Sequence, residues 1–253
     1  MSTNRRQVAA PRVAGVRPLS TVIKTLAVLD RLGASEESMR LADVVHAMGG
    51  NRGSVYQKLL TLCEAGWVEH GADGRYRLSL HANRVGQAAL TQAGLGERAD
   101  PVLQSLAFET KETASLALLD GAEAYIARRV EAAAVLRAEL RVGTPLRLAT
   151  SASGRVLCAY ADPATLQHLR QSGAKLPGDA LMTKVRGDGY AVSSGLDFAG
   201  VRAIAAPVLD AQHRCVAALS LVMPQARFDE TALKGPLRRA AERLHALIAG
   251  VGA

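Results

Sequence analysis

The strongest hydrophobic pattern of the chain lies in residues 39–78. Its first apolar residues recur at intervals of three and four, as on one face of a helix: Leu41, Val44, Val45 and Met48. Gly49 and Gly50 are expected to end this helix, because glycine readily adopts the left-handed conformation that follows a helix C-terminus. The pattern then predicts a second helix that begins near Asn51 and ends at Gly66, and its inward residues are Val55, Leu59 and Leu62.

Two short segments after the second helix predict a hairpin, with strands at 67–69 and 76–78 and a Gly-Ala-Asp-Gly turn at 71–74. The short connection between the helices makes them cross steeply, which presents the second helix to a DNA major groove. The order of these elements predicts a winged helix-turn-helix. The helices alone leave open a second interpretation, a helical hairpin with an ordinary solvated face.

Polar residues of the second helix lie off its apolar stripe, where a groove would need them. Arg52 and Lys58 suit phosphate or guanine, and the side-chain amides of Asn51 and Gln57 suit adenine. Gly53 and Ser54 are small enough for a close backbone approach. The predicted DNA-binding residues are Asn51, Arg52, Gly53, Ser54, Tyr56, Gln57 and Lys58, with Arg75 of the hairpin.

The segments that flank this pattern predict a basic arm, a first helix and a linker. Residues 1–18 are arginine-rich and contain no acid, so we expect a disordered arm. Ser20 is expected to cap a helix whose inward face is Val22, Leu26 and Leu29. These elements make residues 19–79 the DNA-binding domain, and the pattern at 80–97 predicts a linker helix.

The second half of the chain alternates between strand and helix patterns. Asp100 and Pro101 predict the N-cap and first residue of a helix. The predicted strands are 114–119, 124–130, 135–142, 190–193, 201–209 and 215–222. Helices bracket these strands, and hairpins join most of them. We therefore expect residues 98–253 to be an α+β domain built on an antiparallel sheet.

Composition narrows the class of protein. Residues 1–90 hold twelve basic and seven acidic residues, a net charge of +5 out of +8 for the chain, which is the footprint that a polyanionic partner needs. The absence of a long apolar run excludes a membrane-spanning helix, and no signal peptide is apparent. Three widely spaced cysteines indicate a reducing cytoplasm. The histidines show no metal-ligand spacing, so neither a metal nor a cofactor is expected.

Motifs in both halves resemble those of the IclR-type bacterial transcription regulators. In the first half they are KTLAVL at 24–29, RGSVYQKLL at 52–60, and the segments 66–68 and 76–78. In the second half they are RVGTPL at 141–146, ATSASGRVL at 149–157, GVRAIAAPV at 200–208, and the segments 189–191 and 217–220. The order of these motifs matches the family from residue 19 to the C-terminus.

The resemblance implies a dimeric or tetrameric repressor or activator that binds double-stranded operator DNA. It also implies a GAF/profilin-like effector domain that binds a small metabolite, often a carboxylate. The family's effector pocket falls on Ala152, Ser153, Ser193, Val201, Ala203, Ser220 and Val222. The local sequence is consistent with an acid-binding pocket. Ser151, Ser153 and Gly154 lie where a helix is expected to begin, and the free N–H groups of a helix start favour an anion. For each serine, an ordinary helix cap or sheet-surface role is the alternative.

The chain departs from the family pattern at two places. Ser194, Gly195 and Leu196 stand where the family usually has paired acids, which predicts a more apolar pocket mouth and a larger or aromatic effector. Gln57 replaces an arginine of the recognition helix, which predicts a different operator sequence.

Two other functions compete with a ligand-responsive regulator. One is an architectural DNA-binding protein without an effector. The other is a hydrolase that uses Ser151 or Ser153, but the chain has no G-x-S-x-G motif and no assignable base, so no catalytic residue is expected.

Overall fold

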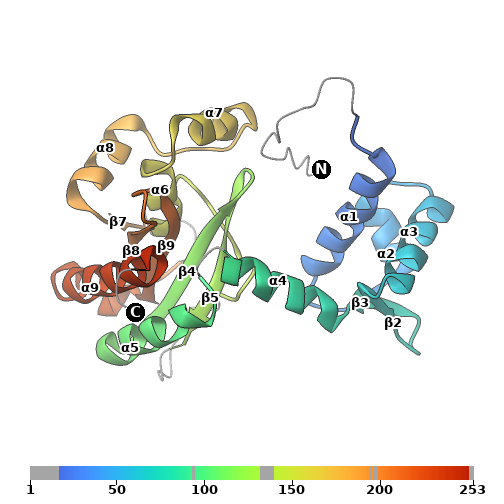
Figure 1. The fold of residues 1–253 in the computed structure, drawn as a ribbon, viewed down its shortest axis with the longest axis horizontal. Helices are drawn as coiled ribbons and strands as arrows, with labels where there is room; N and C mark the ends of the chain where they lie inside the picture. The colour runs from blue at the N-terminus through green and yellow to red at the C-terminus, as the bar shows by residue number, and fades with distance from the viewer. Residues whose placement is uncertain (1–16, 93–94, 132–139, 194, 196–198, 251–253) are drawn as a thin grey trace. The chain divides into compact units, whose positions relative to one another are not determined.

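The computed structural model describes residues 17–92, 95–131, 140–193, 195 and 199–250 (Figure 1). The described chain divides into two compact units, which we call unit 1 (residues 17–90) and unit 2 (residues 91–250). The predicted basic arm, residues 1–18, lies almost entirely outside the described residues.

Unit 1 has the predicted winged helix-turn-helix architecture. Its elements are α1 (Ser20–Gly33), β1 (Met39–Arg40), α2 (Leu41–Met48), α3 (Arg52–Glu64), β2 (Val68–His70), β3 (Arg75–Leu78) and the start of α4 (Leu80–Gln92). The described strands form an antiparallel sheet in the order β1-β3-β2. Gly49 ends α2 with a φ of 62°, the left-handed conformation expected of it.

The core of unit 1 is small. It is formed by Val28, Leu32, Val44, Val55, Leu59, Leu62, Val68 and Tyr76. The predicted inward face of α1 is correct for Leu29, which packs against this core, but wrong for Val22 and Leu26. These two are 49% and 48% exposed, whereas Val28 is fully buried. Helix α1 carries apolar residues on more than one face, so periodicity alone cannot select the buried one. Leu19 occupies the N-cap position, and Ser20, the expected cap, is the first helical residue.

Unit 2 is built on a six-stranded antiparallel sheet, counted over the described residues, in the order β6-β5-β4-β9-β8-β7. Its strands are β4 (Thr113–Asp120), β5 (Glu123–Val130), β6 (Pro145–Leu146), β7 (Ala191–Val192), β8 (Val201–Leu209) and β9 (Cys215–Pro224). Its helices are η1 (Glu97–Ala99), α5 (Asp100–Thr110), α6 (Ala152–Ala159), α7 (Pro163–Gln171), α8 (Asp179–Asp188), η2 (Gln225–Arg227) and α9 (Glu230–Ala249).

Helices cover both faces of this sheet, and each layer has its own core. On one face, α5 and α9 bury Leu103, Leu237 and Leu244 against Leu116 and Leu219 of the central strands. On the other face, a second core joins α6, α7 and α8 to small residues of the same strands (Figure 1). This second face bears the predicted effector residues.

The structure corrects three details of the predicted elements. Residues 140–142 are not a strand, and the strand pairing with β5 comes from Pro145–Leu146; residues 135–139 lie outside the described part. Asp100 is the first residue of α5 and not its cap, and both its carboxylate oxygens accept from Arg128, at 2.6 and 2.7 Å. Helix α4 ends at Gln92, and Leu95 is fully buried in the core of unit 2.

Candidate functional sites

Helix α3 presents a polar face to solvent in unit 1. Val55, Leu59 and Leu62 point inward, and a rotation of about 100° per residue places Gly53 and Gln57 on the opposite side. Both are exposed, as are Tyr56 and Arg52 at the flanks of the same face. The predicted groove-facing residues therefore stand outside the packed interior.

Asn51 and Ser54 are engaged within the helix itself. The side-chain oxygen of Asn51 is the N-cap and accepts from the N–H groups of Gly53 and Ser54, at 2.9 and 3.4 Å. Lys58 Nζ donates to the carbonyl of Ser54 at 2.9 Å and to its hydroxyl. In this geometry Asn51 keeps only its NH₂ group for a base.

Arg75 of the wing also has a structural partner. Its guanidinium donates to the carbonyl of Ser38 at 2.7 Å, which ties β3 to the segment before β1, and Asp73 lies 3.9 Å away. Arg75 is half-buried, unlike Arg52 and Gln57 of α3. A phosphate contact by Arg75 remains a prediction, and it would compete with these bonds.

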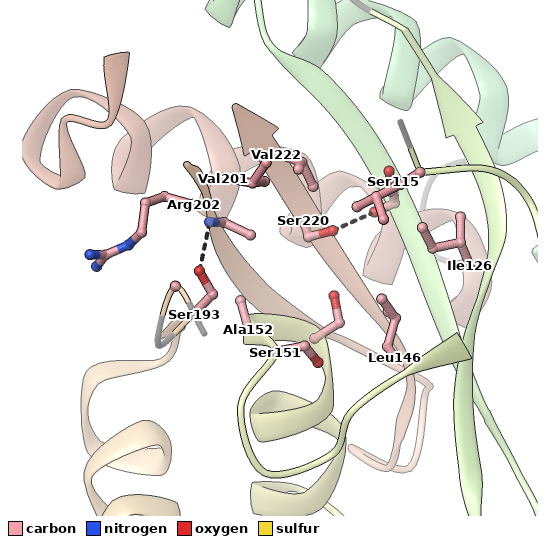
Figure 2. A pocket seen from close by; sticks show the side chains of 14 residues that line it. Ser115, Ile126, Leu146, Ser151, Ala152, Ser193, Val201, Arg202, Ser220 and Val222 are labelled. Carbon is pink, nitrogen blue, oxygen red and sulfur yellow. Dashed lines mark hydrogen bonds between the residues drawn. The ribbon is translucent and has the colours of Figure 1, made fainter. Parts of the chain in front are cut away.

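A cavity opens on the α6 face of the sheet in unit 2, and its empty space, together with the open solvent at its mouth, is about 500 Å³. All seven predicted effector residues line it: Ala152, Ser153, Ser193, Val201, Ala203, Ser220 and Val222. Figure 2 labels five of them, which converge from α6, β8, β9 and the end of β7: Ala152, Ser193, Val201, Ser220 and Val222. The register explains this, because Ala203 pairs with Val222 and Ala205 pairs with Ser220 across β8 and β9.

Helix α6 begins at the edge of the cavity. Ser151 is its N-cap; the hydroxyl accepts from the N–H of Gly154 at 3.0 Å and donates to the carbonyl of Arg147 at 2.7 Å. A Cβ at Gly154 would lie 2.6 Å from that same carbonyl oxygen, so only glycine allows the helix to start this close to the preceding turn. Within the described part of the chain, the backbone N–H groups of Ala152 and Ser153 have no backbone carbonyl as acceptor.

The hydroxyls of the cavity differ in their bonding. Ser193 Oγ accepts from the N–H of Ala203 at 2.9 Å, and Ser220 Oγ donates to the carbonyl of Ser115 at 3.3 Å (Figure 2). Ser153 and Ser220 are 4% and 3% exposed. The lining thus combines buried hydroxyls with an apolar wall.

Sequence reasoning missed five residues of the lining: Ser115, Ile126, Leu140, Leu146 and Arg202. It predicted Ser151 at the helix start and Gly195 at the pocket mouth, and both line the cavity. A signal existed for one of the five missed residues, because Ser115 interrupts an otherwise apolar strand. The others lie on segments that only the tertiary fold brings to α6. Of the residues that departed from the family pattern, Gly195 lines the cavity, whereas Ser194 and Leu196 lie outside the described residues.

The thiols and potential metal ligands do not form a site. Cys63, Cys158 and Cys215 are free, and burial raises the pKa of Cys158 and Cys215 to about 12, which removes their nucleophilic form at neutral pH. The described residues contain no group of three or more His, Cys, Asp or Glu side chains placed to hold a metal ion. None of their helices combines the length and apolarity that a membrane crossing requires.

Models of known protein families match both units of the chain. A model of the bacterial transcriptional regulator IclR C-terminal domain matches residues 87–246, and a model of the IclR helix-turn-helix domain matches residues 21–71. The architecture is that of a DNA-binding regulator with a ligand-binding domain. The chain belongs to the IclR family of bacterial transcriptional regulators.

Relatives and solved structures are similar to this chain over most of its length. The HTH-type transcriptional regulator XynR of Escherichia coli is 28% identical over 227 residues, which are 85% of this chain and 90% of XynR. An IclR transcriptional regulator from Alicyclobacillus acidocaldarius superposes with a TM-score of 0.79 at 22% identity, covering 91% of this chain and 99% of its own. An IclR homolog from Microbacterium hydrocarbonoxydans, complexed with 4-hydroxybenzoate, has a TM-score of 0.76 at 21% identity and covers 91% and 100%.

Proposed function

We propose that this regulator binds operator DNA through α3 and the wing, and that a small carboxylate-bearing or aromatic acid binds in the cavity of unit 2. Residues 19–79 are the DNA-binding head, and residues from about Leu95 onward are the sensing body. The observation that carries the sensing half is the convergence of all seven predicted effector residues on one cavity. The exposure of Arg52 and Gln57 on α3 supports the DNA-binding half.

The start of α6 supports an acid as the effector. The N–H groups of Ala152 and Ser153 lie at the positive end of the helix, where a carboxylate gains both hydrogen bonds and a favourable dipole. Ser193 Oγ accepts from Ala203, so its own proton is available to the ligand. The 4-hydroxybenzoate bound by the Microbacterium homolog agrees with an aromatic acid.

Hydrogen bonding at the same helix argues against a hydrolase. Ser151 Oγ both donates and accepts within its own turn. The described lining contains no His, Asp, Glu or Lys that would take a proton from Ser153. We therefore propose a non-enzymatic, cytoplasmic regulator.

A dimer or tetramer is the assembly that this proposal requires. Two heads read half-sites on one face of the duplex when they are spaced by about 34 Å or a multiple of it. An effector that favours another spacing weakens operator binding by shifting the population of assemblies.

The test is a fluorescence-anisotropy titration of the full chain on DNA from upstream of its own gene, with and without a panel of aromatic and short aliphatic acids. We expect sequence-specific binding that at least one aromatic acid changes. Gln57→Ala should weaken operator binding about tenfold and leave non-specific binding unchanged, whereas Arg52→Ala should weaken both.

Two outcomes would contradict the proposal. Equal binding to operator and unrelated DNA, indifferent to every acid, would favour the architectural alternative. A response to short aliphatic acids alone would contradict the aromatic preference. Footprinting of Gln57→Arg adds a check on base reading, because an unchanged base preference would count against contact by residue 57.

A further inference from the structure

One buried hydroxyl of the cavity has no partner. Ser115 on β4 is 1% exposed, and its Oγ makes no hydrogen bond to any residue that the structure describes. Leaving a buried hydroxyl unpaired costs about 1–3 kcal/mol, so such a group demands an explanation in a native protein. Because Ser115 lines the cavity, a bound molecule is in a position to satisfy it.

Ser220 complements this hydroxyl. It lies directly opposite Ser115 in the β4–β9 register, and its Oγ donates to the Ser115 carbonyl at 3.3 Å (Figure 2). The proton of Ser220 is thereby committed, and its oxygen is left as an acceptor. The pair therefore offers the cavity one O–H donor, from Ser115, and one acceptor, from Ser220. A hydroxyl group, which both donates and accepts, matches the two at once.

The charged residue of the described lining is directed away from this part of the cavity. Arg202 is the one ionisable residue in the described lining, and its guanidinium lies over the ring of Phe228 at 4.8 Å, pointing out of the cavity in Figure 2. Arg129 pairs with Ser115 from the other neighbouring strand, but it is not part of the lining, and its Nε lies 3.8 Å from Glu131. A carboxylate beside Ser115 can accept from its hydroxyl but has no proton to donate to the Ser220 oxygen, whereas a hydroxyl group satisfies both.

We propose that Ser115 and Ser220 form a hydroxyl-binding subsite, and that the effector is a hydroxy-substituted monocarboxylic acid. Its hydroxyl accepts from Ser115 Oγ and donates to Ser220 Oγ, while its apolar body packs against Ile126, Leu146 and Val222. The inference rests on the proposed function, because it takes the carboxylate to lie at the start of α6. It adds Ser115 as the residue that selects hydroxylated acids.

Calorimetric titration of the full chain with rigid ring acids tests this subsite. The probes are benzoate, its 2-, 3- and 4-hydroxy derivatives, and the corresponding benzene dicarboxylates. We expect at least one hydroxybenzoate to bind about tenfold more tightly than benzoate, because one well-placed hydrogen bond to an otherwise unpaired group contributes on that scale. The dicarboxylates should bind more weakly than benzoate.

Ser115→Ala separates a ligand-binding role from a structural one. It should lower the affinity for the preferred hydroxybenzoate about tenfold and change that for benzoate by less than about twofold. The melting temperature of the ligand-free variant should not fall, because the deleted hydroxyl has no partner to lose. Ser105→Ala, an exposed serine of α5 outside the cavity, is the matched control and should change neither affinity.

The outcomes distinguish failure of the hydroxyl subsite from failure of the proposed sensing function. If benzoate and the hydroxybenzoates bind equally, or Ser115→Ala weakens both alike, the hydroxyl subsite is wrong while acid sensing stands. If no acid binds and operator DNA still does, the sensing half of the proposed function fails together with the subsite. Tight binding of a dicarboxylate would overturn the inference on its own.

Discussion

The exposed face of α3 and the cavity of unit 2 both carry polar side chains, but they hold them in opposite environments. Arg52 and Gln57 are exposed, so water satisfies them in the free protein. Ser115, Ser153 and Ser220 are 1%, 4% and 3% exposed, and the Ser115 hydroxyl finds no partner within the described chain. The polar groups of the first surface are therefore solvated in the free protein, whereas the second retains an unpaired buried hydroxyl that the proposed ligand would satisfy.

This contrast teaches where selectivity comes from. Solvated side chains gain little when they exchange water for a partner, so in the proposed function α3 would depend on phosphate charge and on base geometry. Buried groups are expensive to leave unpaired, so a ligand that lacks the matching group is rejected strongly. Ligand binding in the cavity should also stabilise unit 2 by mass action.

The largest expected effect tests whether packing of the buried face of α3 against the core of unit 1 stabilises the helix that carries the exposed face. Leu59 is fully buried in the small core of unit 1. Leu59→Ala should destabilise that unit by roughly 3 kcal/mol, because a cavity replaces packed methyl groups. Urea unfolding followed by the fluorescence of Trp67, the only tryptophan in the chain, reports on unit 1.

Leu60→Ala is the matched control for this experiment. Leu60 is the next residue along α3 and is 48% exposed, so its truncation should change stability by less than about 0.5 kcal/mol. Equal effects of Leu59→Ala and Leu60→Ala would show that α3 is not oriented as described.

A smaller effect is expected where a buried polar group of unit 2 does have a partner. Glu112 has a side chain 8% exposed, and Arg227 donates to both its oxygens at 2.7 and 2.8 Å. Arg227→Met should lower the free energy of unfolding by about 2 kcal/mol, because it leaves buried Glu112 without its counter-ion. This figure is smaller than for a fully buried pair because Arg227 is 40% exposed and solvent screens the interaction. Thermal unfolding followed by far-UV circular dichroism measures the loss.

Arg239→Met provides the control, because the Arg239–Glu109 pair is exposed at 62% and 49% and should contribute less than about 1 kcal/mol. If the Arg227 variant were no less stable than the Arg239 variant, the claim that unpaired buried groups are costly in this unit would be contradicted.

The smallest expected effect concerns a solvated polar group. Asp162 caps α7, and the backbone N–H of Thr165 followed by its hydroxyl lowers the pKa of the carboxyl. Because the folded-state pKa is depressed, the stabilisation is present above the unfolded-state pKa and is lost as pH falls below about 4. Asp162→Ala should cost about 1 kcal/mol at pH 7, measured by thermal unfolding between pH 7 and pH 3.

The difference between wild type and Asp162→Ala should therefore shrink toward pH 3. Asp162→Asn keeps a capping oxygen without a titrating group, so its stability should follow pH more weakly than that of the wild type. A constant difference between wild type and Asp162→Ala at every pH would mean that the cap acts without its charge.

Local sequence patterns predicted an element and its buried face correctly where one face is apolar and the other is polar. The stripe of Val55, Leu59 and Leu62 predicted α3 and its exposed face, and Gly49 ends α2 as predicted. The prediction failed for α1, which is apolar on more than one face, and for Asp100, whose carboxylate binds Arg128 of a distant strand instead of capping its own helix.

By itself, the sequence determined the two-part organisation, the exposed polar face of α3 and seven residues that line the cavity, because periodicity, turns and family motifs are local properties of the chain. Only the tertiary structure decided that Ser115, Ile126 and Leu146 complete the cavity, since strand register joins residues more than a hundred positions apart, such as Ser115 and Ser220. It also decided which hydroxyls keep a partner, because hydrogen bonding depends on what the fold places within about 3 Å.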